Sequence, residues 1–306
     1  MAPKIERIAE IPQLVLGEGP HWDPESQSLL FVDILEKTAY KFIPSTGYLS
    51  KVVFDKPISV IIPVRGKKDQ YLVTLQRDIA IINWDGKSEK PSKIEVLAEV
   101  DVGTENRIND GKCDPRGRFF GGSMGPEPEV GHFTLEAGSF YSYAKGKLEK
   151  HAEKIGISNG LTWNPALKKM YYIDSLAYTI DSFDYDIETG KISNRTPFFS
   201  SKNVGIEGIF DGMTIDKDGN LWVAIFNGSK VIKVDPTKPD TLLQQIDIPA
   251  KQVTSVAWGG IDLDILYVIS ASMTIDGEVL SPPNHGALYR VSGLGTKGLP
   301  MAPFEL

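Results

Sequence analysis

Glu18, Asn109, Asn159 and Asp211 occupy the same place in four similar stretches of the sequence. Each comes five residues before a turn-forming Asp or Asn, and ten or eleven residues before a dense apolar run. A glycine follows each one, directly in three cases and after one residue for Asn109. A single Asn-Gly or Asp-Gly pair is an ordinary turn signal. Four oxygen-bearing side chains at one register instead indicate a shared site.

Two of these side chains, Glu18 and Asp211, are carboxylates, and the other two are amides. If the fold brings them together, the two acids repel each other strongly in a partly dry environment. A divalent cation removes this repulsion, and oxygen ligands suit Ca²⁺, Mg²⁺ or Mn²⁺, with Zn²⁺ tolerated. We therefore predict that the chain holds one divalent metal ion. The neighbouring glycines are expected to give the ion and a ligand access to the backbone.

Six dense apolar runs predict the elements that position these residues. They begin at residues 29, 71, 119, 170, 221 and 266, so they recur every 42 to 51 residues. Each run is followed by a loop and an alternating strand, and most of the units close on a turn. Such a unit is typical of a propeller blade. We predict an all-β fold in which residues 1–306 form a single six-bladed β-propeller domain. A jelly roll or sandwich does not explain six units of similar length.

In a propeller, the first strand of each blade begins at the mouth of the central channel, so equivalent residues of successive blades face one another. Blades two and six offer fewer ligand atoms at this place: Ser59 or Val60, and Thr254 or Ser255.

Two long loops, 124–138 and 272–286, return to the same mouth and are expected to shape a pocket. Glu127 lies on the first loop. Arg107 lies two residues before Asn109, where its charge either neutralises the acids or holds a substrate oxygen.

The bulk composition excludes several classes of partner. The net charge is −7 and no basic face stands out, which argues against nucleic acid and anionic membranes. Cys113 is the only cysteine, so an intramolecular disulfide is impossible. No stretch approaches the ~18 apolar residues of a membrane span, and the first residues lack the apolar core of a signal peptide. We expect a cytoplasmic monomer that acts on a small molecule.

Six motifs occur in an order that is specific when they are taken together: Gly17-Glu18-Gly19-Pro20, Arg107-Ile108-Asn109-Asp110-Gly111-Lys112, Gly121-Gly122-Ser123-Met124, Asn159-Gly160-Leu161-Thr162-Trp163, Met170-Tyr171-Tyr172-Ile173-Asp174 and Asp211-Gly212-Met213. They resemble the regucalcin/gluconolactonase family of six-bladed propellers, whose insect branch includes the luciferin-regenerating enzyme. The resemblance covers essentially the whole chain. It implies that Glu18, Asn159 and Asp211 bind the metal ion and that Asp211 is also the general base. It also implies three substrate contacts: Arg107, Asn109 and Glu127.

The activity that this resemblance implies is hydrolysis of a lactone or similar cyclic ester. One alternative is the conversion of oxyluciferin, as in the insect branch. Such a flat aromatic substrate needs a pocket mouth lined by apolar and aromatic side chains. Four residues could supply this lining: Phe133, Trp163, Tyr178 and Phe210. All four could equally belong to the core of the blades. A third function, from another class, is a calcium-binding regulatory protein without catalysis.

Overall fold

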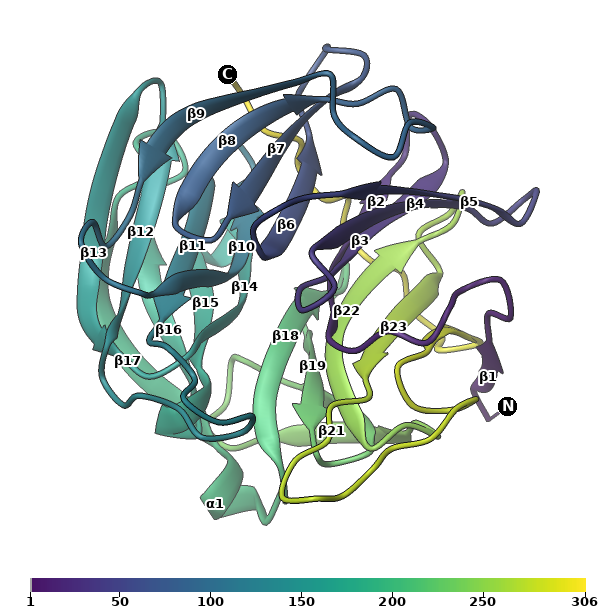
Figure 1. Cartoon of the computed structure of the whole chain (residues 1–306). Helices are drawn as coiled ribbons and strands as arrows, with labels where there is room; N and C mark the ends of the chain where they lie inside the picture. Colours follow the sequence, from purple (N-terminus) through teal and green to yellow (C-terminus); the bar gives the residue numbers. More distant parts are fainter. Residues whose placement is uncertain (1) are drawn as a thin grey trace.

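Each dense apolar run becomes the second strand of a four-stranded antiparallel sheet. The structure is a computed structural model and describes residues 2–306. Six such sheets stand in a ring around a central axis, which confirms the predicted six-bladed β-propeller (Figure 1).

The blades follow one another in chain order. Blade one contains β2 (Gly17–Asp23), β3 (Ser28–Asp33), β4 (Thr38–Ile43) and β5 (Tyr48–Val53). Blade two contains β6 (Ile58–Pro63), β7 (Gln70–Leu75), β8 (Asp78–Asn83) and β9 (Lys93–Glu99). Blade three contains β10 (Arg107–Cys113), β11 (Phe119–Met124), β12 (Gly138–Ala144) and β13 (Lys147–Ile155).

Blade four contains β14 (Ser158–Asn164), β15 (Lys169–Asp174), β16 (Thr179–Tyr185) and β17 (Ile192–Ser200). Blade five contains β18 (Ile209–Ile215), β19 (Leu221–Phe226), β20 (Lys230–Val234) and β21 (Leu242–Asp247). Blade six contains β22 (Gln252–Gly259), β23 (Ile265–Ala271) and β24 (Leu288–Ser292), and its outer strand is the N-terminal β1 (Lys4–Arg7).

Burial falls from the inside of each blade to its outside. Every residue of β3, β11 and β19 is buried, because a second strand has a strand on either side and neighbouring blades pack on both of its faces. The outer strand β9 is mostly exposed. This gradient explains why the second strands are the dense apolar runs of the sequence.

In the part of the chain that the structure describes, helical structure is confined to three short segments, α1 (Ser201–Val204), η1 (Pro165–Leu167) and η2 (Ser175–Ala177). Within residues 2–306, no helix has the length and apolar character needed to cross a membrane.

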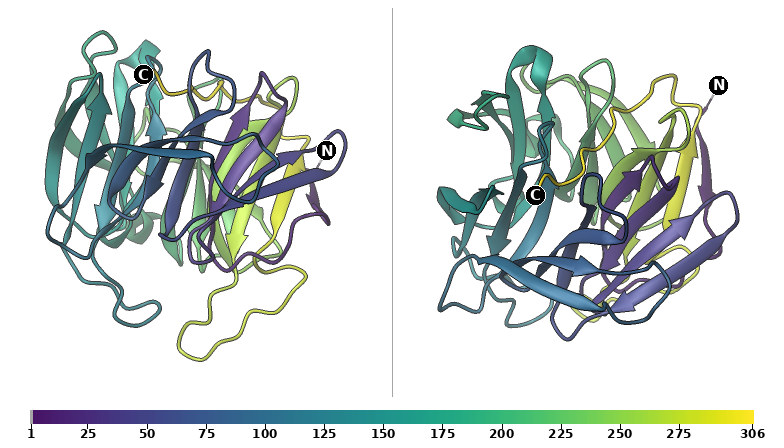
Figure 2. Two further views of the ribbon diagram at one scale, coloured as in Figure 1. Left: turned by 45° about the horizontal axis from the view of Figure 1, so that its top comes forward. Right: turned by 90° about the horizontal axis from the view of Figure 1, so that it is seen from above.

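The two faces of the ring differ. The long loops 124–138 and 272–286 project from one face, which we call the site face, as predicted (Figure 2, left). The C-terminal tail, residues 296–306, crosses the opposite face from blade six towards blades two and three (Figure 2, right). Its contacts include bonds from Gly298 to Leu263 and from Phe304 to Pro63.

Candidate metal and substrate site

Every first strand has an irregularity near its start, where the predicted site residues lie. The pairing with the second strand skips one or two residues in each blade, and these bulged residues are 19–20, 59, 109, 159–160, 211–212 and 254. A bulge removes a residue from the regular ladder and re-aims its side chain. Asn109, Asn159 and Asp211 are therefore freed from sheet pairing by the same device, repeated around the ring.

The glycines at these bulges pack against the next blade. A Cβ on Gly160 would lie 2.6 Å from the backbone oxygen of Asp211, and one on Gly212 would lie 2.0 Å from Oγ of Ser255. The space beside them is thus filled by protein. The expectation that these glycines give an ion access to the backbone is wrong; they allow adjacent first strands to approach closely.

One pocket at the site face brings all the predicted site residues together. The cavity volume open to water-sized molecules is about 60 Å³. Its polar lining residues are Glu18, Arg107, Asn109, Glu127, Asn159, Ser175 and Asp211. Its apolar lining residues are Leu16, Met124, Phe133, Ile157, Ile209, Phe226 and Met273.

Three carboxyl groups are buried in the channel at this depth. Burial raises the pKa of Glu18 to about 8, and the charge of Asp110 adds to this effect. Burial and the charge of Glu18 raise the pKa of Asp211 well above its usual value. Asp110, which sequence reasoning did not single out, also has a raised pKa because it is buried. The acids therefore repel one another, as the sequence predicts for Glu18 and Asp211.

The donor atoms present fit a divalent cation. Asn159 Oδ1 and Asp211 Oδ1 are buried and have no hydrogen-bond partner within residues 2–306. Such unpaired buried oxygens are costly unless an ion or water occupies the space between them. No group of three His, Cys, Asp or Glu side chains in the described part of the chain is arranged to hold a metal. The fit therefore depends on the amide oxygen of Asn159 as well as on the carboxylates of Glu18 and Asp211.

A set of side-chain hydrogen bonds, which we call the inter-blade belt, joins the first strands around the channel. In each bond a side chain of one blade donates to the backbone oxygen just before the site position of the next blade. The bonds are Ser59 Oγ to Ile108 (2.6 Å), Asn109 Nδ2 to Ser158 (2.9 Å), Ser175 Oγ to Phe210 (2.7 Å) and Thr254 Oγ1 to Gly17 (2.5 Å). Ser59 and Thr254, which offered little as ligands, thus have a structural role.

Asn109 is fully engaged by neighbouring groups. Its Nδ2 donates to the belt, and its Oδ1 accepts a 2.6 Å bond from Nη1 of Arg107. Burial lowers the pKa of Arg107, while the charges of Glu127, Glu18 and Asp211 oppose this effect. Arg107 thus faces the carboxylates, and Asn109 fixes the direction of its guanidinium.

Glu127 reaches the pocket from the long loop of blade three. One of its carboxylate oxygens accepts a 2.5 Å bond from the backbone N–H of Gly131. Gly131 in turn lies close to Ile275 on the other long loop, since a Cβ on this glycine would be 2.8 Å from Cγ2 of Ile275. The two loops therefore meet over the mouth of the channel.

Comparison with known proteins decides the family. Residues 16–272 match the SMP-30/gluconolactonase/LRE-like region. The chain belongs to this family. Regucalcin from Sus scrofa is 39% identical over 291 residues, which cover 94% of each chain. The solved structure of a luciferin-regenerating enzyme superposes with a TM-score of 0.95 at 43% identity and covers 100% of both chains. The regucalcin of Agrobacterium tumefaciens, described as a calcium-binding protein, superposes with a TM-score of 0.86 at 26% identity, covering 98% of this chain and 97% of that one.

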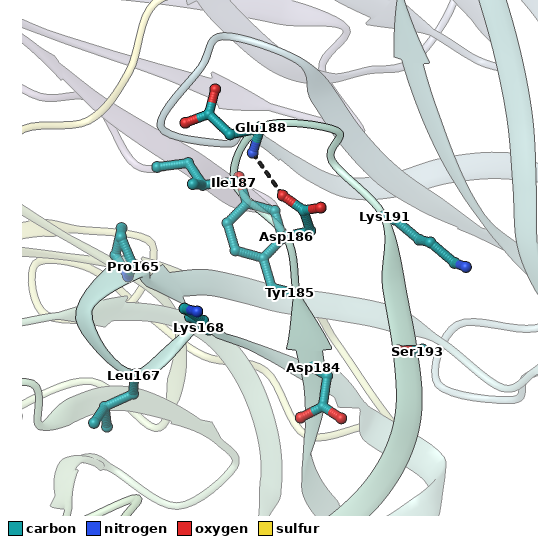
Figure 3. A pocket seen from close by; sticks show the side chains of 10 residues that line it. All are labelled: Pro165, Leu167, Lys168, Asp184, Tyr185, Asp186, Ile187, Glu188, Lys191 and Ser193. Carbon is teal, nitrogen blue, oxygen red and sulfur yellow. Dashed lines mark hydrogen bonds between the residues drawn. The ribbon is translucent and has the colours of Figure 1, made fainter.

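A second hollow, on the opposite face of blade four, is rich in acids (Figure 3). Asp184 is bonded to Lys169 and Asn194. Asp186 accepts from the backbone N–H of Glu188, and Glu188 forms an ion pair with Arg116. These carboxylates stabilise a turn and ion pairs.

The structure separates the four aromatic residues considered for the mouth. Only Phe133 lines the pocket. Trp163 and Phe210 are buried in the core between blades, and Tyr178 lies beneath the ammonium of Lys202. Sequence reasoning missed Ser175 and Met273, because neither belongs to the repeated register from which the other site residues were read.

Proposed function

We propose that this protein is a divalent-metal-dependent hydrolase that acts, as a single chain, on lactone-type cyclic esters. The observation that carries the proposal is the pair of buried, unpartnered oxygens on Asn159 and Asp211, beside the carboxylate of Glu18. Membership of the SMP-30/gluconolactonase/LRE-like family supports the same conclusion.

Glu18, Asn159 and Asp211 would hold the metal ion through their side-chain oxygens. When bound there, a divalent ion supplies a Lewis acid that polarises an ester carbonyl and makes water more acidic. Asp211 has two carboxylate oxygens, so one is free to accept the proton of the attacking water. Asp211 then returns this proton to the ring oxygen as the ester C–O bond breaks, which leaves a hydroxy acid.

The remaining polar groups orient the substrate. Arg107, held by Asn109, directs a fixed cation into the pocket and binds a substrate oxygen. Glu127 accepts hydrogen bonds from substrate hydroxyl groups. Because the ester is already oriented when it is bound, less entropy is lost in reaching the transition state.

An Asp211→Asn variant tests this proposal. Turnover of gluconolactone with added metal should fall by at least about 10²-fold, because the proton acceptor is lost. The melting temperature of the metal-free protein should not fall, because a source of carboxylate repulsion is removed. Asp218→Asn, which changes an exposed carboxylate on the opposite face, should leave turnover unchanged. Full activity of Asp211→Asn would refute the role of Asp211.

A second candidate is the conversion of oxyluciferin, as the name of the luciferin-regenerating enzyme suggests. Half of the pocket lining is apolar, including Phe133, Phe226 and Met273, and this wall suits a flat aromatic ring better than a sugar. Parallel assays with gluconolactone and oxyluciferin distinguish the two candidates. Higher kcat/KM for oxyluciferin would favour the second one.

A further inference from the structure

The orientation of the Asn159 amide is fixed by one neighbouring hydroxyl group. Nδ2 of Asn159 lies 3.0 Å from Oγ of Ser175, and Oγ of Ser175 lies 2.7 Å from the backbone oxygen of Phe210. A serine hydroxyl has a single hydrogen to donate. Because a carbonyl oxygen can only accept, Ser175 donates to Phe210 and must accept from Asn159. The NH₂ end of the amide is thereby held on Ser175, and Oδ1 is left facing the pocket.

Comparison of the blades shows what Ser175 replaces. In blade three the bulged residue Asn109 itself donates to the next blade, and this bond uses its NH₂ group. In blade four the bulged residue is again an asparagine, but Ser175 makes the inter-blade bond instead. Asn159 is thus released from the inter-blade belt.

In blades one and five the site residues are Glu18 and Asp211. In the ionised form that binds a cation, they have no hydrogen to donate to a neighbouring carbonyl. Among the site residues, the three side chains that form no belt bond within residues 2–306 are therefore the same three that are proposed as metal ligands.

Ser175 itself is held rigidly. It is 1% exposed and begins the short helix η2 directly after β15. Its backbone N–H donates to the backbone oxygen of Ile157, at 3.0 Å. A fixed hydroxyl can hold the amide without a further loss of freedom when a ligand binds.

We infer that Ser175 is a positioning residue for the metal site, which turns the amide oxygen of Asn159 towards the ion by taking over its inter-blade hydrogen bond. This inference rests on the proposed metal site. Partners that orient a metal ligand in this way commonly contribute 10- to 100-fold to metal affinity.

The test is calorimetric titration of the metal-free full-length protein with Ca²⁺ and, separately, Mn²⁺. Ser175→Ala should bind the preferred ion about 10- to 100-fold more weakly than the unsubstituted protein. Ser59→Ala is the matched control, because it removes an equivalent buried belt bond that touches none of the proposed ligands. Its affinity should stay within about twofold. Ser175→Cys keeps only a weak donor and should give a smaller loss, which preserves the test if the alanine variant folds poorly.

A double variant separates orientation from general loosening. In an Asn159→Asp background either end of the side chain is an oxygen, so orientation no longer matters. Ser175→Ala should then lower affinity by less than about twofold. Equal losses in Ser59→Ala and Ser175→Ala, or an undiminished loss in the Asn159→Asp background, would overturn the role of Ser175. Failure of the unsubstituted protein to bind any divalent ion would instead overturn the metal site itself.

Discussion

At the scale of single residues, the channel buries several titratable side chains. Glu18, Asp110 and Asp211 face two cations, Arg107 and Lys112. The Nζ of Lys112 donates a 2.7 Å bond to the backbone oxygen of Met213 in blade five, and burial lowers the pKa of this lysine to about 8. Burial and mutual repulsion raise the pKa values of the three acids, and a cation bound among them would offset both effects.

His21 provides a pH-dependent prediction that does not involve the proposed ligands. Burial lowers the pKa of His21 to about 4; Asp23 on the same strand opposes this shift and Lys112 on β10 adds to it. An unfolded histidine titrates near 6.5, so between these values only the unfolded chain takes up the proton. Stability should therefore fall as the pH falls from 6.5 towards 4, by up to about 3 kcal/mol from this residue.

Urea unfolding at pH 7, 5.5 and 4.5 measures this effect in the unsubstituted protein and in His21→Gln. The variant should lose less stability on acidification, because the buried imidazole is gone. Other groups, including Glu18 and Asp211, titrate in both proteins and drop out of the difference. His132→Gln removes an exposed histidine and should keep the original slope. Equal slopes for all three proteins would contradict the prediction.

At the scale of elements, the turn after each first strand shows what the sequence can and cannot reveal. The Asp or Asn five residues after the site position predicts a turn, and Asp114, Asn164 and Asp216 all accept backbone N–H bonds there. Their environments nevertheless differ. Asp114 and Asp216 are completely buried, whereas Asn164 is partly exposed. Partners from distant strands decide this difference, and the local pattern does not record them.

The candidate site also combines features that the sequence repeat predicts with features that it does not. Repeated spacing was sufficient to predict that Glu18, Asn159 and Asp211 meet, since a ring of similar blades brings equal positions together. The bulges depend on pairing with a second strand, and the hydroxyl of Ser175 comes from outside the repeated register. These features arise from tertiary contacts, so the sequence pattern did not indicate them.

Substitution of Asp216 measures how much a buried turn residue contributes to the free energy of unfolding. Its carboxylate accepts bonds from Asn220 N at 2.9 Å and Trp222 Nε1 at 3.0 Å, and it pairs with Lys233 at 3.0 Å. Asp216→Ala leaves these buried groups unpaired and should lower the free energy of unfolding by about 3 to 5 kcal/mol. Asn164→Ala, at the equivalent turn of blade four, should lower it by only about 1 kcal/mol. Similar losses in urea denaturation would show that burial is not the deciding factor.

At the scale of the whole molecule, the ring is closed by both ends of the described chain. Residues 4–7 pair with 289–292, so blade six is completed by a strand almost the full chain length away. The tail then crosses the opposite face, where Lys217 N bonds to the backbone oxygen of Lys297 and Glu305 N bonds to that of Gly117. Neither closure has a local signature, because β1 is a four-residue strand with no alternating apolar pattern and the tail forms no regular element.

Phe304 is the anchor of this tail and provides a direct test of its role. Its side chain is 1% exposed and packs in the core cluster of blades two and three, 6.4 Å from the ring of Tyr143. Its backbone bonds to Pro63 and Arg65, both at 2.8 Å. Phe304→Ala should lower the free energy of unfolding by about 3 kcal/mol or more, as for other buried aromatic residues. Leu306→Ala, on the same tail but exposed, should change it by less than about 0.5 kcal/mol.

Hydrogen exchange then distinguishes a tail that fastens particular blades from one that only adds core volume. In Phe304→Ala, amides of β6 and β10 should exchange faster, because the tail binds beside the ends of these strands. Amides of β14 should change less, since none of the tail's backbone hydrogen bonds within residues 2–306 runs to blade four. A uniform increase around the ring would mean that the six blades open as one unit, in which case Phe304 stabilises the propeller as a whole and not mainly blades two and three, where its side chain packs.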